Sequence, residues 1–292
     1  MGIITSQQLT TYYDKYRDME IMFSKEITTI LHLVPRQIYF KCGGEQWPCI
    51  INSTSFLQSR IIIGTRGGAF RKITEKENAK VSLHFSFTPP KSDLVTFFVN
   101  TRVSEVSKFS GNQELAIVTL EFTQRPPDLL IELVGRIHAA NKNAFRRREE
   151  RITISKEVTR KLQLDDKKTT FSIDNVPRKC ILRDISFSGA KVIIVGVPKF
   201  VKNKEAVVGF SFEEPDEFIE IAGKVVQVVS IEGRKELLAV SLHFDEPKVS
   251  LAYKIRISNY LSTIRIKKPA NSADENSTIS DEKIASEKAN KE

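Results

Sequence analysis

Cysteine and histidine are scarce in this chain, and neither has the spacing of a disulfide framework or a metal site. The cysteines are odd in number and contain no C-x-x-C pair, which argues against a disulfide framework and a thiolate metal site. The histidines are scattered without partners at metal-ligand spacing, and we interpret them as ordinary surface or packing residues. No metal site is therefore expected. The residues concerned are Cys42, Cys49, Cys180, His32, His84, His138 and His243.

Long apolar runs and a secretory leader are also missing. No apolar stretch approaches the roughly 20 residues that a membrane span needs. The first residues lack both the basic start and the apolar core of a signal peptide. We therefore expect a soluble, cytoplasmic protein.

Catalytic groupings are absent as well. No Ser/His/Asp, Cys/His or paired-carboxylate constellation stands out. The glycines of residues 64–68 lack the lysine and the spacing of a phosphate-binding P-loop, and we interpret them as a turn. The sequence thus favours a binding protein without a cofactor over an enzyme.

Positive charge is what the chain has in excess. The net charge is +9 over 292 residues, and residues 269–292 contain six acids against three lysines. Removing that −3 leaves about +12 on residues 1–268. Such a surplus favours anionic partners, from phosphate ligands to nucleic acid, without choosing among them. The acidic tail has no apolar periodicity, and we expect it to be disordered.

The sequence repeats itself. An ungapped shift of 131 residues aligns residues 23–63 with residues 154–194, with 13 identities in 41 positions. After a gap, residues 81–87 resemble residues 207–212, and residues 114–122 resemble residues 236–244. Two copies of one domain therefore stand in tandem.

Each copy has the pattern of a small β-barrel followed by a helix. Segments rich in β-branched and aromatic residues are bounded by Gly, Asp, Asn and Pro clusters, which predicts short antiparallel strands. In the second copy these segments are residues 191–195, 206–212, 219–229 and 237–244. Apolar residues at helical spacing predict closing helices over residues 127–138 and 250–264, and we also expect a helix over residues 6–17.

Two arginines lie between the copies, and a D-x-S-x-x-G string follows them. Arg147 and Arg151 suit a phosphate ligand, because a planar guanidinium grips phosphate oxygens bidentately and also stacks on a purine. Asp184 offers acceptor oxygens to the two donors of a guanine edge, which adenine lacks. Ser186 adds a hydroxyl, and Gly189 leaves room for a close approach to the backbone. Either half alone is a common pattern, but together they predict a site for a guanine-bearing phosphate ligand.

These residues resemble the PilZ domain, a bacterial six-stranded β-barrel that binds cyclic di-GMP. The resemblance covers roughly residues 144–262. It implies that Arg147 and Arg151 hold the phosphates and stack on guanine, while Asp184 and Ser186 read a guanine edge. Arg146 is similar to the extra arginine with which some members hold an intercalated ligand dimer. The last strand lacks a glycine that members often have, which we expect to alter packing rather than to abolish binding.

The two-barrel layout is similar to the spirochaete PilZ proteins and, more loosely, to flagellar-brake proteins. It implies a second-messenger receptor in bacterial signalling, in processes such as motility or virulence. The first copy has lost most of the motif, so we predict that it does not bind the ligand and serves in partner docking and gating. Under the 131-residue shift Ser55 matches Ser186, whereas Tyr16, Glu20, Ser53 and Gln58 replace Arg147, Arg151, Asp184 and Gly189.

The predicted architecture is mainly β, with two tandem six-stranded antiparallel PilZ-like barrels, each followed by a helix. We expect a degenerate first barrel with its closing helix (residues 1–140), an arginine-bearing linker (141–151), a PilZ domain that binds cyclic di-GMP (152–266) and a disordered tail (267–292). The ligand would fold the linker onto the second barrel and reorient the first, which signals to an unidentified protein partner. The alternative is a nucleic-acid-binding protein, which predicts exposed aromatics among basic residues and a steep salt dependence.

Overall fold

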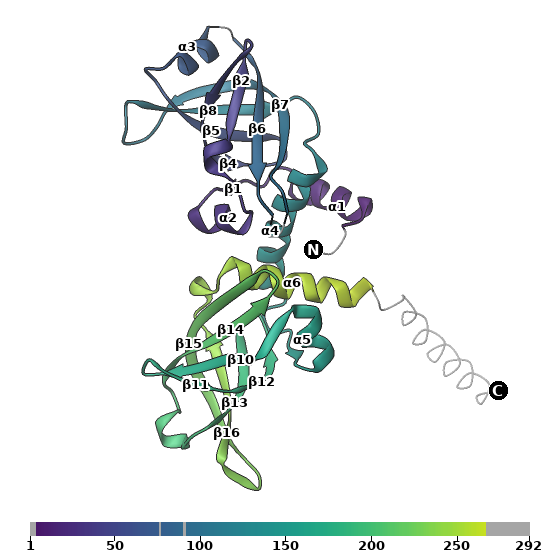
Figure 1. Ribbon diagram of the computed structural model, residues 1–292, viewed down its shortest axis with the longest axis vertical. Helices are drawn as coiled ribbons and strands as arrows, with labels where there is room; N and C mark the ends of the chain where they lie inside the picture. The colour runs from purple at the N-terminus through teal and green to yellow at the C-terminus, as the bar shows by residue number, and fades with distance from the viewer. Residues whose placement is uncertain (1–3, 76, 90–91, 267–292) are drawn as a thin grey trace, which may run out of the picture.

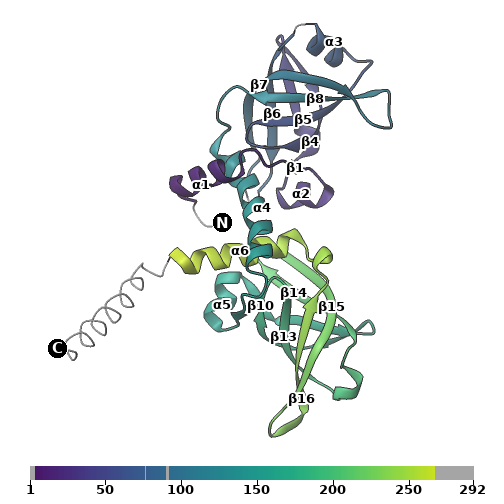
Figure 2. The same cartoon turned by 180° about the vertical axis from the view of Figure 1, so that it is seen from behind.

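Two β-rich units stand end to end in the computed structural model, with two helices crossing between them (Figure 1, Figure 2). The structure describes residues 4–75, 77–89 and 92–266. The predicted disordered tail, residues 267–292, lies outside the described residues. Within the described part of the chain, no helix is both long enough and apolar enough to cross a membrane.

The first unit is an eight-stranded antiparallel sheet that curves into a barrel. Only Cys49 separates strand β3 from strand β4. The Cys49 amide donates to the carbonyl of Ile38, the residue before strand β2, at 3.3 Å. This bond draws the two ends of the curved sheet together. Along the sheet the strands are β1 (Ile21–Met22), β4 (Ile50–Thr54), β5 (Gln58–Gly64), β8 (Leu115–Phe122), β7 (Val95–Lys108), β6 (Lys80–Phe87), β2 (Tyr39–Cys42) and β3 (Glu45–Pro48).

The second unit has the same strand order, which agrees with the tandem repeat in the sequence. Strands β10 and β12 lie in contact and bring the ends of this sheet together. The shared aromatic residues of the repeat are core residues, since Phe40 and Phe171 are both fully buried. The matching strands are β9 (Ile152–Thr153), β12 (Ile181–Ile185), β13 (Gly189–Val195), β16 (Arg234–Phe244), β15 (Asp216–Ile231), β14 (Glu205–Glu213), β10 (Leu164–Ile173) and β11 (Val176–Lys179).

The number of strands differs from the prediction of six in each barrel. The additional strands are short: β1 and β9 have two residues, and β3 and β11 have four. Strands β3 and β11 bury no residue, so they have no alternation of apolar and polar positions for a sequence pattern to detect. The fold class is confirmed, because each unit remains a small antiparallel barrel.

Helices frame each barrel. The predicted first helix is confirmed as α1 (Ser6–Tyr16), which Thr5 and Gln8 cap reciprocally. The closing helices are α4 (Asp128–Arg146) and α6 (Leu251–Ile266). Three short helices were not predicted: α2 (Lys25–Ile30), α3 (Gly68–Thr74) and α5 (Lys156–Leu162). Single 3-10 turns also occur at η1 (Pro35–Gln37), η2 (Pro198–Phe200) and η3 (Glu246–Lys248).

Helix α4 corrects the predicted linker, because it continues to Arg146 and includes the first half of residues 141–151. No glycine or proline interrupts residues 136–146, and alanines favour the helix there. The extension is also held by the second unit, since the Asn143 side-chain amide donates to the Ser258 hydroxyl of α6 at 2.8 Å. Only residues 147–151 are left to connect the two copies.

The two barrels share parts of their cores through α4 and α6. Leu251 and Ile255 of α6 pack against the core of the first barrel, and Ala144 of α4 packs against the core of the second. The Glu26 carboxylate of α2 accepts a hydrogen bond at 2.7 Å from the amide of Leu251, where α6 begins. A side chain of one copy therefore caps the closing helix of the other.

Candidate functional site

The arginine segment, residues 147–151, is a short turn between α4 and β9. Arg147 ends the helix, and its amide donates to the Asn143 carbonyl at 2.8 Å. The Glu150 amide then donates to the Arg147 carbonyl at 2.9 Å, before the chain joins the edge of the second sheet as β9. This turn places Arg151 beside strand β12, which contains Asp184.

Arg151 and Asp184 form an ion pair, so the two halves of the predicted motif come together in the fold. The Asp184 side chain is 18% exposed and the Arg151 side chain 42%. Asp184 lies opposite Thr153 in the β12–β9 pairing, and a bulge in β12 between Leu182 and Asp184 sets its register. The carboxylate predicted to read a guanine edge is thus half-covered and held beside a cation.

Arg147 has an unmet hydrogen-bonding group. Its side chain is only 17% exposed, and its Nε lies 3.8 Å from the Glu150 carboxylate. Among the described residues its buried Nη1 finds no hydrogen-bond partner. A buried guanidinium nitrogen without an acceptor is costly, and an anionic ligand oxygen would remove that cost. The predicted phosphate-binding arginine is therefore positioned with a free donor.

Ser186 is fully buried, and its hydroxyl holds the turn of the D-x-S-x-x-G string. It accepts from the Ser188 amide at 3.3 Å and donates to the Gly189 carbonyl at 3.3 Å. Ser55 makes the same bonds in the first barrel, with the amides of Leu57 and Gln58 and the carbonyl of Gln58. This structural task explains why the serine is the one motif residue that both copies retain.

Gly189 also has a structural task. A Cβ built on it would lie 2.3 Å from the Leu242 carbonyl oxygen of β16, closer than real Cβ atoms approach. The missing side chain therefore lets strands β13 and β16 approach each other. The sequence predicts a close approach to the backbone at Gly189, and in the structure strand β16 makes such an approach.

Ser188 connects the motif turn with the arginine segment, and the sequence analysis missed it. Its buried hydroxyl lies 3.0 Å from the Arg148 carbonyl and 3.1 Å from the Glu149 carboxylate, and can donate to either. Arg148 in turn pairs with Glu246 at 2.5 Å and donates to His243 Nε2 at 3.2 Å. Hydroxyl-to-backbone bonds leave no spacing pattern in a sequence, so only the position of Ser188 inside the motif could have indicated it.

The turn of the motif is also tied to the closing helix. The hydroxyl of Tyr253, a fully buried residue of α6, donates to the Ser186 carbonyl at 2.8 Å. Burial raises the pKa of Tyr253, so this hydroxyl keeps its proton. The same helix begins at Leu251, which the first barrel caps through Glu26. Helix α6 thus has one hydrogen bond to the candidate site and another to the first barrel.

The surroundings of the site are basic. Lys191 of β13 lies opposite Asp184, and Lys224 of β15 and Gly189 of β13 lie on either side of His243 in β16. Arg146, in the last turn of α4, is exposed. Cations at these positions favour a ligand with negative charge. Among the residues that the structure describes, no three His, Cys, Asp or Glu side chains gather closely enough to hold a metal ion.

The corresponding place in the first barrel is filled by the protein's own groups. Ser53 donates to the Glu20 carboxylate at 2.5 Å, which repeats the geometry of Asp184 and Arg151 with an acid in place of the arginine. Glu20 also pairs with Arg60 at 3.5 Å. Tyr16, which replaces Arg147, is buried and stacks on the His138 ring with centroids 5.4 Å apart. An acid and a buried aromatic ring offer nothing to a phosphate.

The site differs from two hollows on the surface of the described chain. One of about 650 Å³ is lined by Met19, Met22 and Ile137 beside the first barrel, and one of about 600 Å³ lies between α2 and β15. Neither includes Arg147, Arg151 or Asp184. The site is defined by its charges and its unmet donor rather than by an enclosed cavity.

Comparisons with known proteins agree with the resemblance. A cyclic di-GMP binding protein of Treponema denticola is 40% identical over 272 residues, which is 92% of this chain and 86% of that protein. Among solved structures, Borreliella burgdorferi PlzA in complex with c-di-GMP is 25% identical, covers 87% of this chain and 98% of its own, and has a TM-score of 0.38. Escherichia coli YcgR in complex with c-di-GMP is 12% identical, covers 82% and 88%, and has a TM-score of 0.28.

A family model matches both copies. The PilZN3 domain aligns with residues 7–141 and again with residues 142–249, so the two matches meet within α4. With the Treponema relative, this assigns the family over nearly all of the described chain. The chain belongs to the PilZN3-domain family and contains two copies of the domain in tandem.

Proposed function

We propose that this protein is a receptor for cyclic di-GMP and that the ligand binds on the second barrel. Arg147 and Arg151 would hold the phosphates and stack on guanine, with Arg146 beside them, and Asp184 would read a guanine edge. Ser186 and Gly189 would shape the turn that presents these groups. The functional units would be residues 1–140, the arginine segment with the end of α4, and residues 152–266. We propose binding and signalling rather than catalysis.

The observation that carries this proposal is the unmet donor of Arg147. A largely buried guanidinium with an unmet Nη1 favours an anionic ligand, and the Asp184 carboxylate favours donor groups on the same ligand. A cyclic dinucleotide supplies phosphate oxygens for the arginines and a guanine edge for Asp184. The name of the 40% identical relative from Treponema denticola supports the same ligand.

Titration calorimetry tests the proposal. We expect cyclic di-GMP to bind the purified full chain, and cyclic di-AMP and GMP to bind far more weakly. Cyclic di-AMP presents no guanine edge to Asp184, and GMP supplies one phosphate and one base instead of two. All binding should reside in the second barrel. If cyclic di-AMP bound as tightly as cyclic di-GMP, the role of Asp184 would be contradicted. If GMP also bound as tightly as cyclic di-GMP, the proposed receptor function would be contradicted.

We further propose that the bound ligand reorients the barrels. The ligand would hold residues 146–151 more closely against the second barrel, where Arg151 already pairs with Asp184. These residues continue α4, which packs on α6 and reaches the first barrel. Helix α6 provides a second connection. The Tyr253 hydroxyl of α6 bonds to Ser186 at the site, and the Glu26 side chain of the first barrel caps α6 at Leu251. A ligand that contacts this segment in only one arrangement shifts the balance between arrangements.

Small-angle scattering measures that reorientation. Addition of cyclic di-GMP to the full chain should change its radius of gyration. A variant with Arg147→Ala, which is expected not to bind at the same ligand concentration, should keep the ligand-free dimensions. If the wild-type protein binds the ligand at unchanged dimensions, the coupling is wrong although the receptor function stands.

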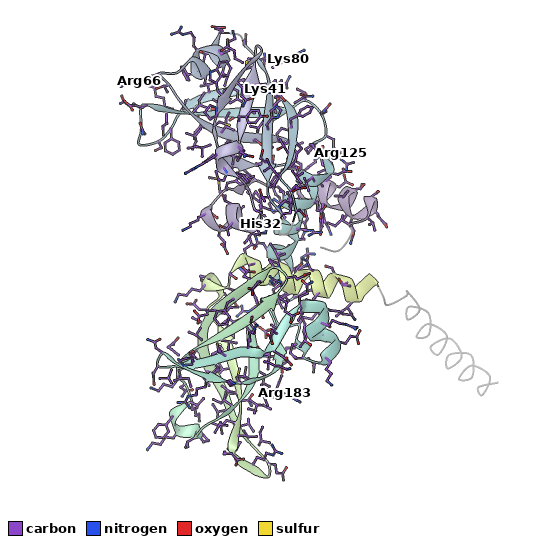
Figure 3. All side chains as sticks on the ribbon, in the orientation of Figure 1. His32, Lys41, Arg66, Lys80, Arg125 and Arg183 are labelled. Carbon is purple, nitrogen blue, oxygen red and sulfur yellow. The ribbon has the colours of Figure 1, made fainter. Side chains whose placement is uncertain are left out.

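One observation supports nucleic acid binding as a second candidate. Tyr39, His84 and Phe98 form a row across β2, β6 and β7 of the first barrel, with centroids 4.5 and 5.5 Å apart, and Lys41 lies 5.8 Å from the Tyr39 centroid. Lys41 and Lys80 lie on this barrel toward its far end (Figure 3). The rings stack on one another, however, which covers faces that a base would use. A salt series with single-stranded DNA, run beside the titration, separates the two functions.

A further inference from the structure

A second candidate surface lies at the far end of the second barrel. We call Val195, the last residue of β13, and residues 196–204, between β13 and β14, the tip loop; it lies toward the end of the second barrel that points away from the first (Figure 1, Figure 2). Three of its apolar side chains face solvent: Val195 is 64% exposed, Val197 55% and Phe200 68%. Single exposed apolar residues are ordinary, but a group of three on one short loop marks an interaction surface.

The charge of the tip loop is of one sign. Residues 195–204 contain three lysines and no acid. Lys204 pairs with Asp174 of the neighbouring hairpin at 3.4 Å. Lys199 and Lys202 are exposed, and within the described part of the chain neither forms an ion pair. Two unpaired cations therefore flank the most exposed aromatic side chain of the loop, and they favour an anionic partner.

The tip loop is also preformed. The Phe200 amide donates to the Val197 carbonyl at 3.0 Å, and the Lys202 amide donates to the Pro198 carbonyl at 3.0 Å. Val201 points into the barrel and is 2% exposed, which anchors the loop between its exposed neighbours. Because these amides already have partners, the loop can enter an apolar medium without leaving them unsatisfied. Little conformational freedom would be lost on binding.

The first barrel does not repeat this feature. Helix α3 occupies the corresponding connection between β5 and β6. Ile73 of α3 is 1% exposed and Phe70 packs against the core, so both apolar side chains turn inward. The exposed apolar residues of the tip loop are thus specific to the copy with the candidate ligand site.

We propose that the tip loop docks on an anionic lipid surface. Val197 and Phe200 enter the boundary between headgroups and acyl chains, while Lys199 and Lys202 contact lipid phosphates. Alternating apolar and cationic side chains on a projecting loop suit a lipid surface better than an acidic protein. This inference does not depend on cyclic di-GMP binding.

Co-sedimentation of the full chain with lipid vesicles tests this proposal. We expect binding to vesicles of phosphatidylcholine with phosphatidylglycerol, weak binding to pure phosphatidylcholine, and a decrease in binding with added salt. Phe200→Ala should weaken binding about tenfold, because it removes one large apolar side chain from the lipid. The double variant Lys199→Glu/Lys202→Glu should abolish it. Phe145→Ala removes an aromatic side chain that is 87% exposed on α4 and should leave vesicle binding unchanged.

All the altered side chains are exposed, so melting temperatures equal to that of the wild type would show that the variants fold. Absence of wild-type binding to anionic vesicles would overturn the proposal. So would equal binding to neutral vesicles, or wild-type binding by both tip-loop variants. In those cases the exposed side chains would instead belong to a protein interface.

Discussion

Alanine in place of Arg147 is expected to weaken cyclic di-GMP binding about a hundredfold, because charge-assisted bonds to a half-buried guanidinium are strong. The Nη1 atom of Arg147 is buried without a partner in the ligand-free protein, so its bond to the ligand replaces no existing bond. Calorimetric titration of the variant measures the loss. Arg147→Lys should give an intermediate affinity, because lysine keeps the charge without the planar donor pair.

The same substitution should leave the fold intact. Removing a buried donor that lacks an acceptor relieves a cost, so the melting temperature of Arg147→Ala should equal or slightly exceed that of the wild type. Arg160→Ala removes an equal charge from an exposed position on α5 of the same barrel and should retain full affinity. An Arg147→Ala protein that binds as tightly as wild type would show that the site is elsewhere.

Alanine in place of Gly189 should lower the free energy of unfolding by about 2 kcal/mol, because overpacking of this kind strains the backbone. Its Cβ would meet the Leu242 carbonyl oxygen at 2.3 Å, and both groups belong to paired strands that cannot move apart freely. Urea denaturation followed by circular dichroism measures the change. Ligand binding should weaken as well, since the strained strand begins at the motif turn.

Gly64→Ala is the matched control for Gly189. Gly64 also lies in a strand that corresponds to β13, but the nearest atom to its added Cβ is 4.0 Å away, so the variant should be close to neutral. If Gly189→Ala keeps wild-type stability and loses only affinity, the glycine serves the ligand, as the sequence pattern alone predicts. If Gly189→Ala lost stability but kept its affinity for cyclic di-GMP, the turn at Gly189 would have no part in ligand binding.

Much of the fold could be predicted from the sequence because the chain contains its own comparison. Identities such as Phe40 with Phe171 mark core positions, and both are fully buried. The short helices and edge strands were not predicted, because a segment of a few residues is too short to show the hydrophobic periodicity of a helix or a strand. The end of α4 was missed for another reason: residues 141–146 were interpreted as part of a linker, but the Asn143 side chain bonds to Ser258 of a helix more than a hundred residues away.

The candidate site also has parts that the sequence could predict and parts that it could not. The sequence analysis assigned Arg151 and Asp184 to one site, and the two side chains do lie together, but it did not predict that they pair with each other. The tasks of Ser186 and Gly189 depend on which backbone atoms approach them, and no residue type encodes that. The retention of Ser55 in the first copy was a signal that the serine supports the turn, since that copy has lost the arginines and the acid.

The exchange of side chains between the barrels has a consequence for how such a protein can evolve. Leu251 and Ile255 extend the core of the first copy although they belong to the second, and Ala144 does the reverse. Loss of either copy would expose these side chains to water, so we expect each barrel to be less stable alone than in the pair. Packing of this kind favours retention of the first barrel even after its binding residues have changed.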